Sequence, residues 1–364
     1  MPVRIIVKLQ NTISSASSAI LICAAVVIVI AGVKSASGII APLLMAGFIS
    51  IICSAPLYWL KRHGLSNTIS LIIILAGVGV LGVAVFSLIA NSLDAFSGSI
   101  PRYKQNLTLL YNELNNTLTN WGYALPIEGL REQLSPNSFI KFLNYMLSGL
   151  SNILGDGLVV FLAVLFILTE VATLPDKLRA SLKNPDHSMV YFNDFITKVI
   201  HYLGLKAATS VLTAVCVAII LWLLKIDYVF LWAVLAFFLN FIPYVGSFLA
   251  GLPAVLLGLI DHGILVALWA AAGYVAINIV VGNIIETRWM GDDLNLSSFV
   301  VFVSLIFWGW VLGPTGMFLS IPLTMSITIA LESNPQTRPI ALLMQNADAL
   351  TDNAANSATK SGLS

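Results

Sequence analysis

The side chains best suited to bind a solute are a few polar residues inside long apolar stretches of the second half of the chain. Asn240 comes just before a proline break, and Thr315 follows a Gly-Pro break farther along. Polar side chains at membrane depth usually face the interior of a helix bundle or a water-filled cavity. Their alternative role is interhelical hydrogen bonding, which holds neighbouring helices together. The candidate solute-binding residues are Asn240, Pro243, Gly246, Ser247, Asn278, Gly313, Pro314 and Thr315.

A second group of candidates surrounds the point where one apolar stretch ends. Asn278, Gly282 and Glu286 follow at intervals of four, so a helix brings them close to one face. Arg288 adds a nearby positive charge. Two interpretations stay open, a solvated loop and an ion-pair gate that breaks and re-forms as a binding site changes sides. The candidate gate residues are Asn283, Glu286, Arg288 and Asp292.

The sequence carries no recognisable enzyme motif. It has no Walker A sequence, so nucleotide hydrolysis within this chain would not drive transport. The four histidines are scattered without ligand spacing, and the three cysteines each lie in an apolar run. The net charge of +1 does not favour a nucleic-acid partner. We therefore expect a non-enzymatic protein with no cofactor and no metal site.

Composition places the candidate residues in a lipid bilayer. The chain is 58% hydrophobic and 10% charged, with a mean hydropathy of +0.93. These values are typical of polytopic membrane proteins and exclude a soluble globular domain. We predict an all-α polytopic integral membrane protein with six to eight transmembrane helices.

Changes in polarity along the chain suggest a division into six parts. Positive charge is concentrated in the segments that we assign to the cytoplasm, together with both termini. The predicted parts are residues 1–93 with three scaffold helices, a polar amphipathic helical segment on the periplasmic side at 94–147, a fourth membrane helix at 148–174, a basic cytoplasmic helical segment at 175–206, a transport unit at 207–332, and a disordered cytoplasmic tail at 333–364.

The transport unit contains two unusually long apolar segments, at residues 228–260 and 294–331, on either side of an ordinary one at 263–285. A bilayer core is crossed by about 20 helical residues, so neither long segment fits as one straight helix. Each is broken near its middle by glycine and proline, a pattern that marks the binding site of many transporters. Either both segments cross the membrane, giving eight spans, or each folds back as a re-entrant hairpin.

Positive charge does not separate these topologies, because only Arg288 changes side between them. We favour hairpins, because arms of roughly 15 residues are too short to cross alone. In that topology the two hairpins enter the membrane from opposite faces. Their non-helical turns must then be buried in protein or line a cavity.

Four stretches of the C-terminal half resemble the autoinducer-2 exporter family. They are FIPYVG at residues 241–246, GNIIE at 282–286, SSFVVFVSLIFWGWVLGPTGM at 297–317, and SIPLT at 320–324. The resemblance extends over nearly the whole chain. It implies a bacterial inner-membrane protein that exports the furanone-type signal autoinducer-2, as a homo-oligomer and specifically a pentamer. Some relatives resemble sodium/proton antiporters instead.

These observations predict a quorum-signal efflux transporter for autoinducer-2 or a similar small polar solute. Alternating access would move the two broken segments and the helix between them against the scaffold helices, and an elevator-like motion is one form of it. The first alternative is a sodium (or lithium)/proton antiporter. The second is a membrane scaffold that transports nothing.

Overall fold

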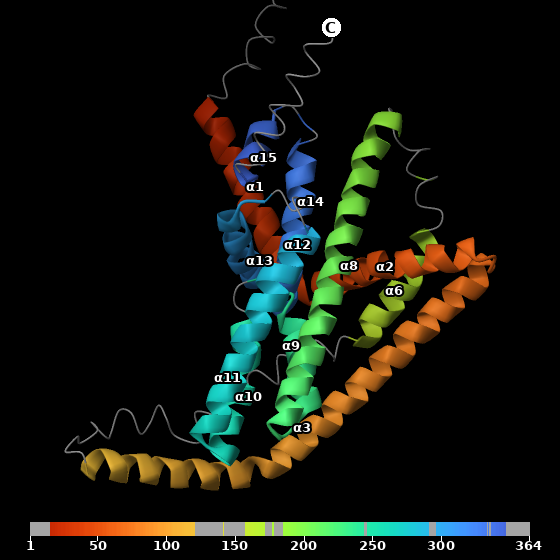
Figure 1. The fold of residues 1–364 in the computed structure, drawn as a ribbon. Helices are drawn as coiled ribbons and strands as arrows, with labels where there is room; N and C mark the ends of the chain where they lie inside the picture. Colours follow the sequence, from red (N-terminus) through yellow and green to blue (C-terminus); the bar gives the residue numbers. More distant parts are fainter. Residues whose placement is uncertain are drawn as a thin grey trace, which may run out of the picture.

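A computed structural model describes residues 15–120, 141, 157–171, 177, 185–243, 246–290, 296–332, 334 and 336–346. These residues are helical apart from short turns and one isolated bridge (Figure 1). The helices in chain order are α1 (Ser15–Ser35), α2 (Ser37–Arg62), α3 (Asn67–Asn120), α6 (Gly157–Val171), α8 (Pro185–Leu223), α9 (Val229–Leu239), α10 (Gly246–His262), α11 (Ile264–Ile277), η2 (Asn278–Ile285), α12 (Glu286–Met290), α13 (Ser298–Phe318), α14 (Ser320–Glu332) and α15 (Arg338–Met344).

Five of the described helical stretches are long and apolar enough to cross a membrane, and five shorter apolar helices accompany them. Large apolar side chains are exposed along them, among them Trp222 and Phe248 at 70% each. Such exposure is expected where lipid, and not water, surrounds the helix. The fold is therefore the predicted all-α polytopic membrane protein. The long stretches are Ser37–Arg62, Asn67–Leu110, Ile196–Leu223, Ile264–Trp289 and Ser298–Phe318.

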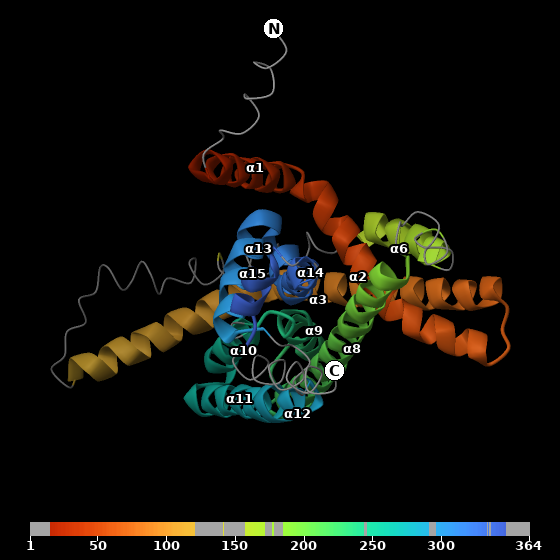
Figure 2. The same cartoon turned by 90° about the horizontal axis from the view of Figure 1, so that it is seen from above.

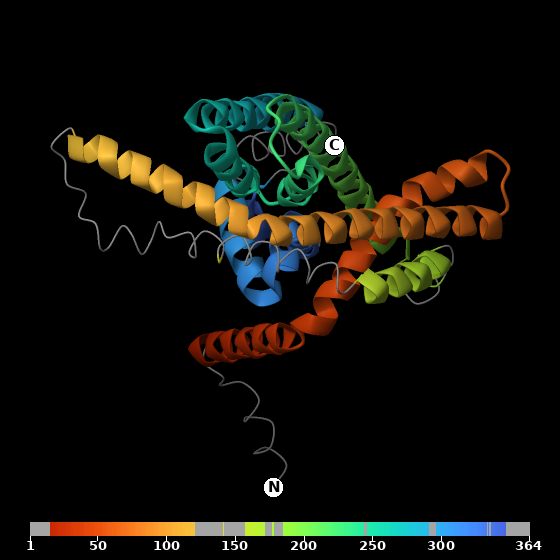
Figure 3. The ribbon, with the colours of Figure 1, turned by 90° about the horizontal axis from the view of Figure 1, so that it is seen from below.

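Helix α3 lies across the whole molecule. Seen from above and below, α10 and α11 lie on one side of it, whereas α1 and α6 lie on the other (Figures 2 and 3). It also changes direction near one end of the molecule (Figure 1), and it contains Pro101, a residue type that kinks helices. The boundary expected after residue 93 falls inside α3, and the one expected after residue 206 falls inside α8. Of the polar segment expected at 94–147, residues 121–140 and 142–147 lie outside the described part.

Helices α9 and α10, with the turn between them, form a helical hairpin that we call the first hairpin. Its two ends meet one residue of α3, because Arg102 Nη2 lies 2.6 Å from the Asp227 carboxylate and 2.9 Å from the Asp261 carboxylate. Asn106 also donates to Asp261 at 3.0 Å. The 228–260 segment therefore returns to the level at which it started.

Helices α13 and α14 form the second hairpin. Gly313 has φ +68°, a left-handed conformation that glycine adopts without steric cost, and it separates two helical stretches within α13. The arms are joined across the hairpin by Trp308, whose indole Nε1 donates to Thr324 Oγ1 at 3.1 Å. Near the open end, the Ser297 N–H donates to the Met344 carbonyl at 2.9 Å.

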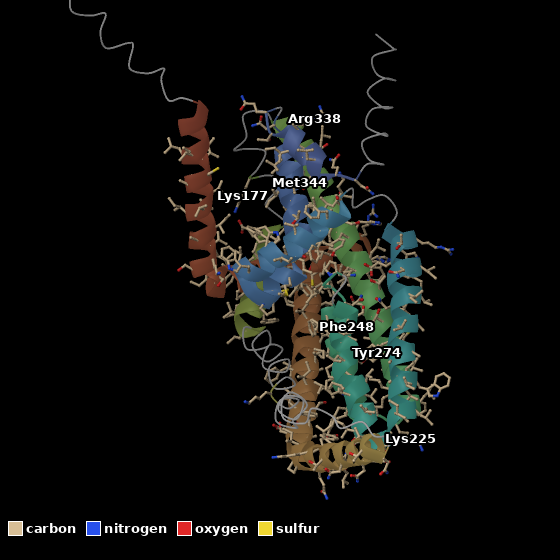
Figure 4. The ribbon with its side chains drawn as sticks, turned by 90° about the vertical axis from the view of Figure 1, so that its left-hand side faces the viewer. Lys177, Lys225, Phe248, Tyr274, Arg338 and Met344 are labelled. Carbon is tan, nitrogen blue, oxygen red and sulfur yellow. The ribbon has the colours of Figure 1, made fainter. Side chains whose placement is uncertain are left out.

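The tip of the first hairpin meets the second hairpin. The rings of Phe241 and Phe318 stack with centroids 4.1 Å apart and planes 24° apart. The open ends point away from each other, because Lys225 lies at one end of the molecule and Arg338 near the other (Figure 4). The break of the first segment thus lies against the second hairpin, between the ends of the molecule.

Each tip depends on a glycine with no room for a side chain. A Cβ on Gly246 would overlap the carbonyl oxygen of Leu239, and one on Gly316 would overlap that of Trp308. We predict that Gly246→Ala and Gly316→Ala each lower the thermal midpoint of the purified protein, because the backbone itself must shift. Gly77→Ala in α3 is the control, since its Cβ meets nothing within 4 Å. Equal midpoints for all three variants would contradict the tip geometry.

Candidate functional site

A cavity of about 560 Å³ lies between α8, the tip of the first hairpin, η2 and the start of α13. Its volume is in the range of small-molecule sites. Six of the predicted residues line it: Asn240, Pro243, Ser247, Asn278, Asn283 and Glu286. The exposed Asn278 and Asn283 lie at its open side, whereas the buried Asn240 lies at its closed side.

At the cavity wall, a hydrogen bond joins the first hairpin to the helix formed by α11 and η2. Ser247 Oγ, in the first turn of α10, donates to Asn278 Oδ1 at 2.8 Å. A Cβ at position 282 would lie 3.2 Å from the same Asn278 oxygen, so a side chain there would crowd the amide. The small Gly282 therefore leaves space for Asn278 at the cavity wall.

Asn278 also marks a change in helix type. The helix that begins as α11 widens into the π-helical η2 over Asn278–Ile285 and returns to α-helix at Glu286. Residues four apart in an α-helix drift by about 40° around the axis, because each residue turns about 100°. The wider π turn reduces this drift, so Asn278, Gly282 and Glu286 all reach the cavity. Single π turns within α-helices are frequent at functional sites.

At the closed side, Asn240 is fixed by helix α8. It is 8% exposed, and its Nδ2 donates to Ser210 Oγ at 3.0 Å. Asn240 directly follows α9, where the turn begins. Its amide thus attaches the tip of the first hairpin to α8.

The one charged pair lining the cavity in the described part of the chain joins Lys206 to Glu286. Lys206 Nζ lies 2.6 Å from Glu286 Oε1, and their side chains are only 7% and 16% exposed. Thr209 Oγ1 lies 3.4 Å from the other carboxylate oxygen. A buried charge is tolerated only with a partner, so each of these two ions holds the other in place.

Four of the predicted solute-binding residues do not line the cavity. Gly246 forms the tip turn behind it, and Gly313, Pro314 and Thr315 shape the tip of the second hairpin. The Thr315 carbonyl accepts a hydrogen bond from the Leu319 N–H at 3.0 Å, which serves the turn. Of the predicted gate residues, Arg288 does not line the cavity either, and Asp292 lies outside the described residues.

The sequence interpretation missed Tyr202 and Lys206, which line the cavity from α8. It assigned both to the cytoplasmic segment at 175–206, because positively charged residues outnumber acidic ones there. In the structure α8 runs without interruption from Pro185 to Leu223. The available signal was the spacing of four between the two residues, which a helix places on one face.

The cavity is equipped to bind and not to react. Its polar groups are amides, hydroxyls and one closed ion pair, which hydrogen-bond a solute without activating a nucleophile. No group of three or more potential metal-binding side chains occurs among the described residues. This lining suits reversible recognition of a small polar molecule.

Comparison with known proteins agrees with this geometry. The model of the AI-2E family transporters matches residues 19–336. A putative transport protein of Haemophilus influenzae is 37% identical over 327 residues, 88% of this chain and 94% of its own. The AI-2 transport protein TqsA of Escherichia coli is 35% identical over 320 residues, 88% of this chain and 93% of its own. Another Escherichia coli relative, the putative transport protein YhhT, is 31% identical over 321 residues, 88% and 92% of the two chains.

These relatives are transport proteins and not enzymes, and they are bacterial. Together with the apolar helices, they indicate a transport role in the bacterial inner membrane, which the chain crosses several times. The match covers both hairpins and the cavity between them. The chain therefore belongs to the AI-2E family of membrane transporters.

Proposed function

We propose that the protein exports autoinducer-2 or a similar small polar solute by alternating access through the cavity. The observation that carries this proposal is a polar cavity of about 560 Å³ at the tip of the first hairpin. A hydroxyl-rich signal needs several hydrogen-bond partners, and Asn278, Ser247 and Asn240 supply amides and a hydroxyl. The 35% identity to a protein named as an AI-2 transporter supports the same solute class.

We further propose that both hairpins are re-entrant and enter the membrane from opposite faces, with both chain termini in the cytoplasm. The first hairpin supports this, because Asp227 and Asp261 at its two ends share Arg102. In this arrangement the hairpins and the helix of α11, η2 and α12 form the mobile unit. The scaffold consists of α1–α3 and α6.

Oligomerisation is part of the proposal. Only 6% of the most apolar 18-residue window of α3 is buried, so a long apolar face is available to lipid or to other copies. We propose a homo-oligomer, specifically a pentamer as the family resemblance implies, in which α3 contributes to the contacts between copies.

The solute site is tested by removing its amide. We predict that Asn278→Ala lowers autoinducer-2 efflux from cells or liposomes by about tenfold, because two or more hydrogen bonds to solute and Ser247 are lost. Protein level in the membrane should stay unchanged. The control is Ser326→Ala, whose hydroxyl donates to the Pro322 carbonyl of its own helix. Normal efflux from the Asn278 variant would remove this residue from the site.

The topology is tested by labelling single cysteines in a variant without the native Cys23, Cys53 and Cys216. We predict that cysteines at Lys225 and His262 react with a membrane-impermeant maleimide from the same face, because both lie at the open end of the first hairpin. A cysteine at Arg338 should react from the opposite face. Labelling of positions 225 and 262 from different faces would favour eight crossings.

A second candidate function, sodium/proton antiport, is supported by the buried pair of Lys206 and Glu286. A carboxylate within a transporter cavity can exchange its cation partner for a sodium ion or a proton. In antiport, a sodium gradient drives proton movement in liposomes, and Glu286→Gln abolishes it while the exposed Glu113→Gln does not. Solute export, the function proposed above, predicts the opposite result. We therefore expect no sodium-driven proton movement in liposomes with the wild-type protein.

A further inference from the structure

Basic and aromatic side chains gather at the end of α2, far from the cavity. Lys61 and Arg62 are the last two residues of this helix, which is long and apolar enough to cross a membrane. Neither forms an ion pair with another described residue. Two adjacent cations without a counter-ion attract an anion, and the bilayer surface is where this helix ends.

The surroundings of these two cations are positive. Residues 1–93 contain five lysines and arginines and no aspartate or glutamate. Helix α6 packs against α2 and carries Glu170, but the carboxylate of Glu170 is paired with Lys177. The end of α2 therefore has a net positive charge that the neighbouring helices do not cancel.

A hollow of about 600 Å³ lies along the outward face of α2. Its lining residues recur at three and four positions, which a helix places on one face, and they are Ala55, Tyr58, Trp59, Lys61 and Arg62. The opposite face of α2 is buried against α6 through Cys53 and Leu57. From Ala55 to Arg62 the helix rises roughly 10 Å. Over that length the lining changes from apolar, through aromatic, to basic.

The aromatic residues mark the level at which this hollow meets the lipid headgroups. Tyr58 and Trp59 are 51% and 59% exposed, and tryptophan and tyrosine are enriched at the bilayer interface. The Lys61 ammonium lies 5.5 Å from the centroid of the Tyr58 ring, within the range of a cation–π contact. The end of α2 also lies at the outer edge of the molecule, away from α10 and α11, where lipid can reach it (Figures 2 and 3).

We propose that the outward face of α2 binds an anionic phospholipid. The headgroup phosphate lies against Lys61 and Arg62, and an acyl chain follows the face past Tyr58 towards Ala55. Free phosphate would use the two cations but not the apolar part of the hollow, so the whole face fits a lipid better. The bound lipid holds α2 in place, and α6 with it. This inference concerns neither the solute nor the cavity.

The test compares two lipids that share their acyl chains and differ in headgroup charge. Dioleoylphosphatidylglycerol or dioleoylphosphatidylcholine is added to the purified full-length protein in detergent, and native mass spectrometry measures the bound lipid. We expect the wild type to bind phosphatidylglycerol more tightly than phosphatidylcholine. In the double variant Lys61→Gln/Arg62→Gln the affinity for phosphatidylglycerol should fall roughly 25-fold, because each cation near an anionic surface contributes about fivefold.

The matched control removes two positive charges elsewhere. Lys104 and Lys225 are exposed and also lack an ion pair with another described residue. The variant Lys104→Gln/Lys225→Gln therefore has the same net charge as the test variant. It should keep the affinity of the wild type for phosphatidylglycerol.

Three results would overturn the inference, and none of them bears on the proposed function. Equal binding of the two lipids by the wild type shows that the face does not select an anion. Equal loss of phosphatidylglycerol in both double variants shows that only the overall charge matters. Displacement of phosphatidylglycerol by millimolar inorganic phosphate shows a site for a free anion and not for a lipid.

Discussion

Backbone N–H and C=O groups that lie deep in a bilayer find no water, and this constraint governs the arrangement of both hairpins. Each hairpin contains a turn whose backbone leaves the regular helix pattern. The first turn lies against the second hairpin, where Phe241 stacks on Phe318 at 4.1 Å, and the second turn packs against α1 and α2 through Val311 and Leu312. Neither turn would be tolerated facing lipid, so the first hairpin depends on the second, and the second depends on α1 and α2. The cavity borders the tip of the first hairpin, where the folded-back chain leaves space beside α8 and η2.

The same constraint explains why charge in the cavity is paired. Glu286 stands at the end of a π-helical stretch and Lys206 in the middle of a long helix, and neither residue could stay ionised alone at that depth. The pair connects α8 to the helix of α11, η2 and α12. Asn240 connects α8 to the first hairpin through Ser210. Helix α8 is therefore the common support of the site, although the sequence interpretation assigned its first part to the cytoplasm.

Patterns that depend on neighbouring residues were readable from the sequence, and those that depend on packing were not. The glycine and proline breaks at Gly246 and Gly313 are local chemistry, so the all-α membrane fold and the position of both turns could be predicted. Which face of a turn borders the cavity depends on how the helices pack, and the sequence does not show this. For this reason Thr315 was predicted to bind solute together with Asn278, although its carbonyl accepts a hydrogen bond within its own hairpin. The partner of Glu286 depends on α8, which lies 80 residues away in the sequence.

Any movement of the first hairpin must take account of its attachment to α3. Arg102 holds both ends of the hairpin, and Asn106 and Tyr103 add hydrogen bonds to the same two carboxylates. The tip is held by Asn240 and Ser247, through single uncharged bonds of a kind that a solute can replace. The hairpin is thus tied by charge at its open end and by weaker polar contacts at its tip. In the proposed alternating access, a motion that pivots about the open end would keep the contacts of Arg102 and displace the tip beside the cavity.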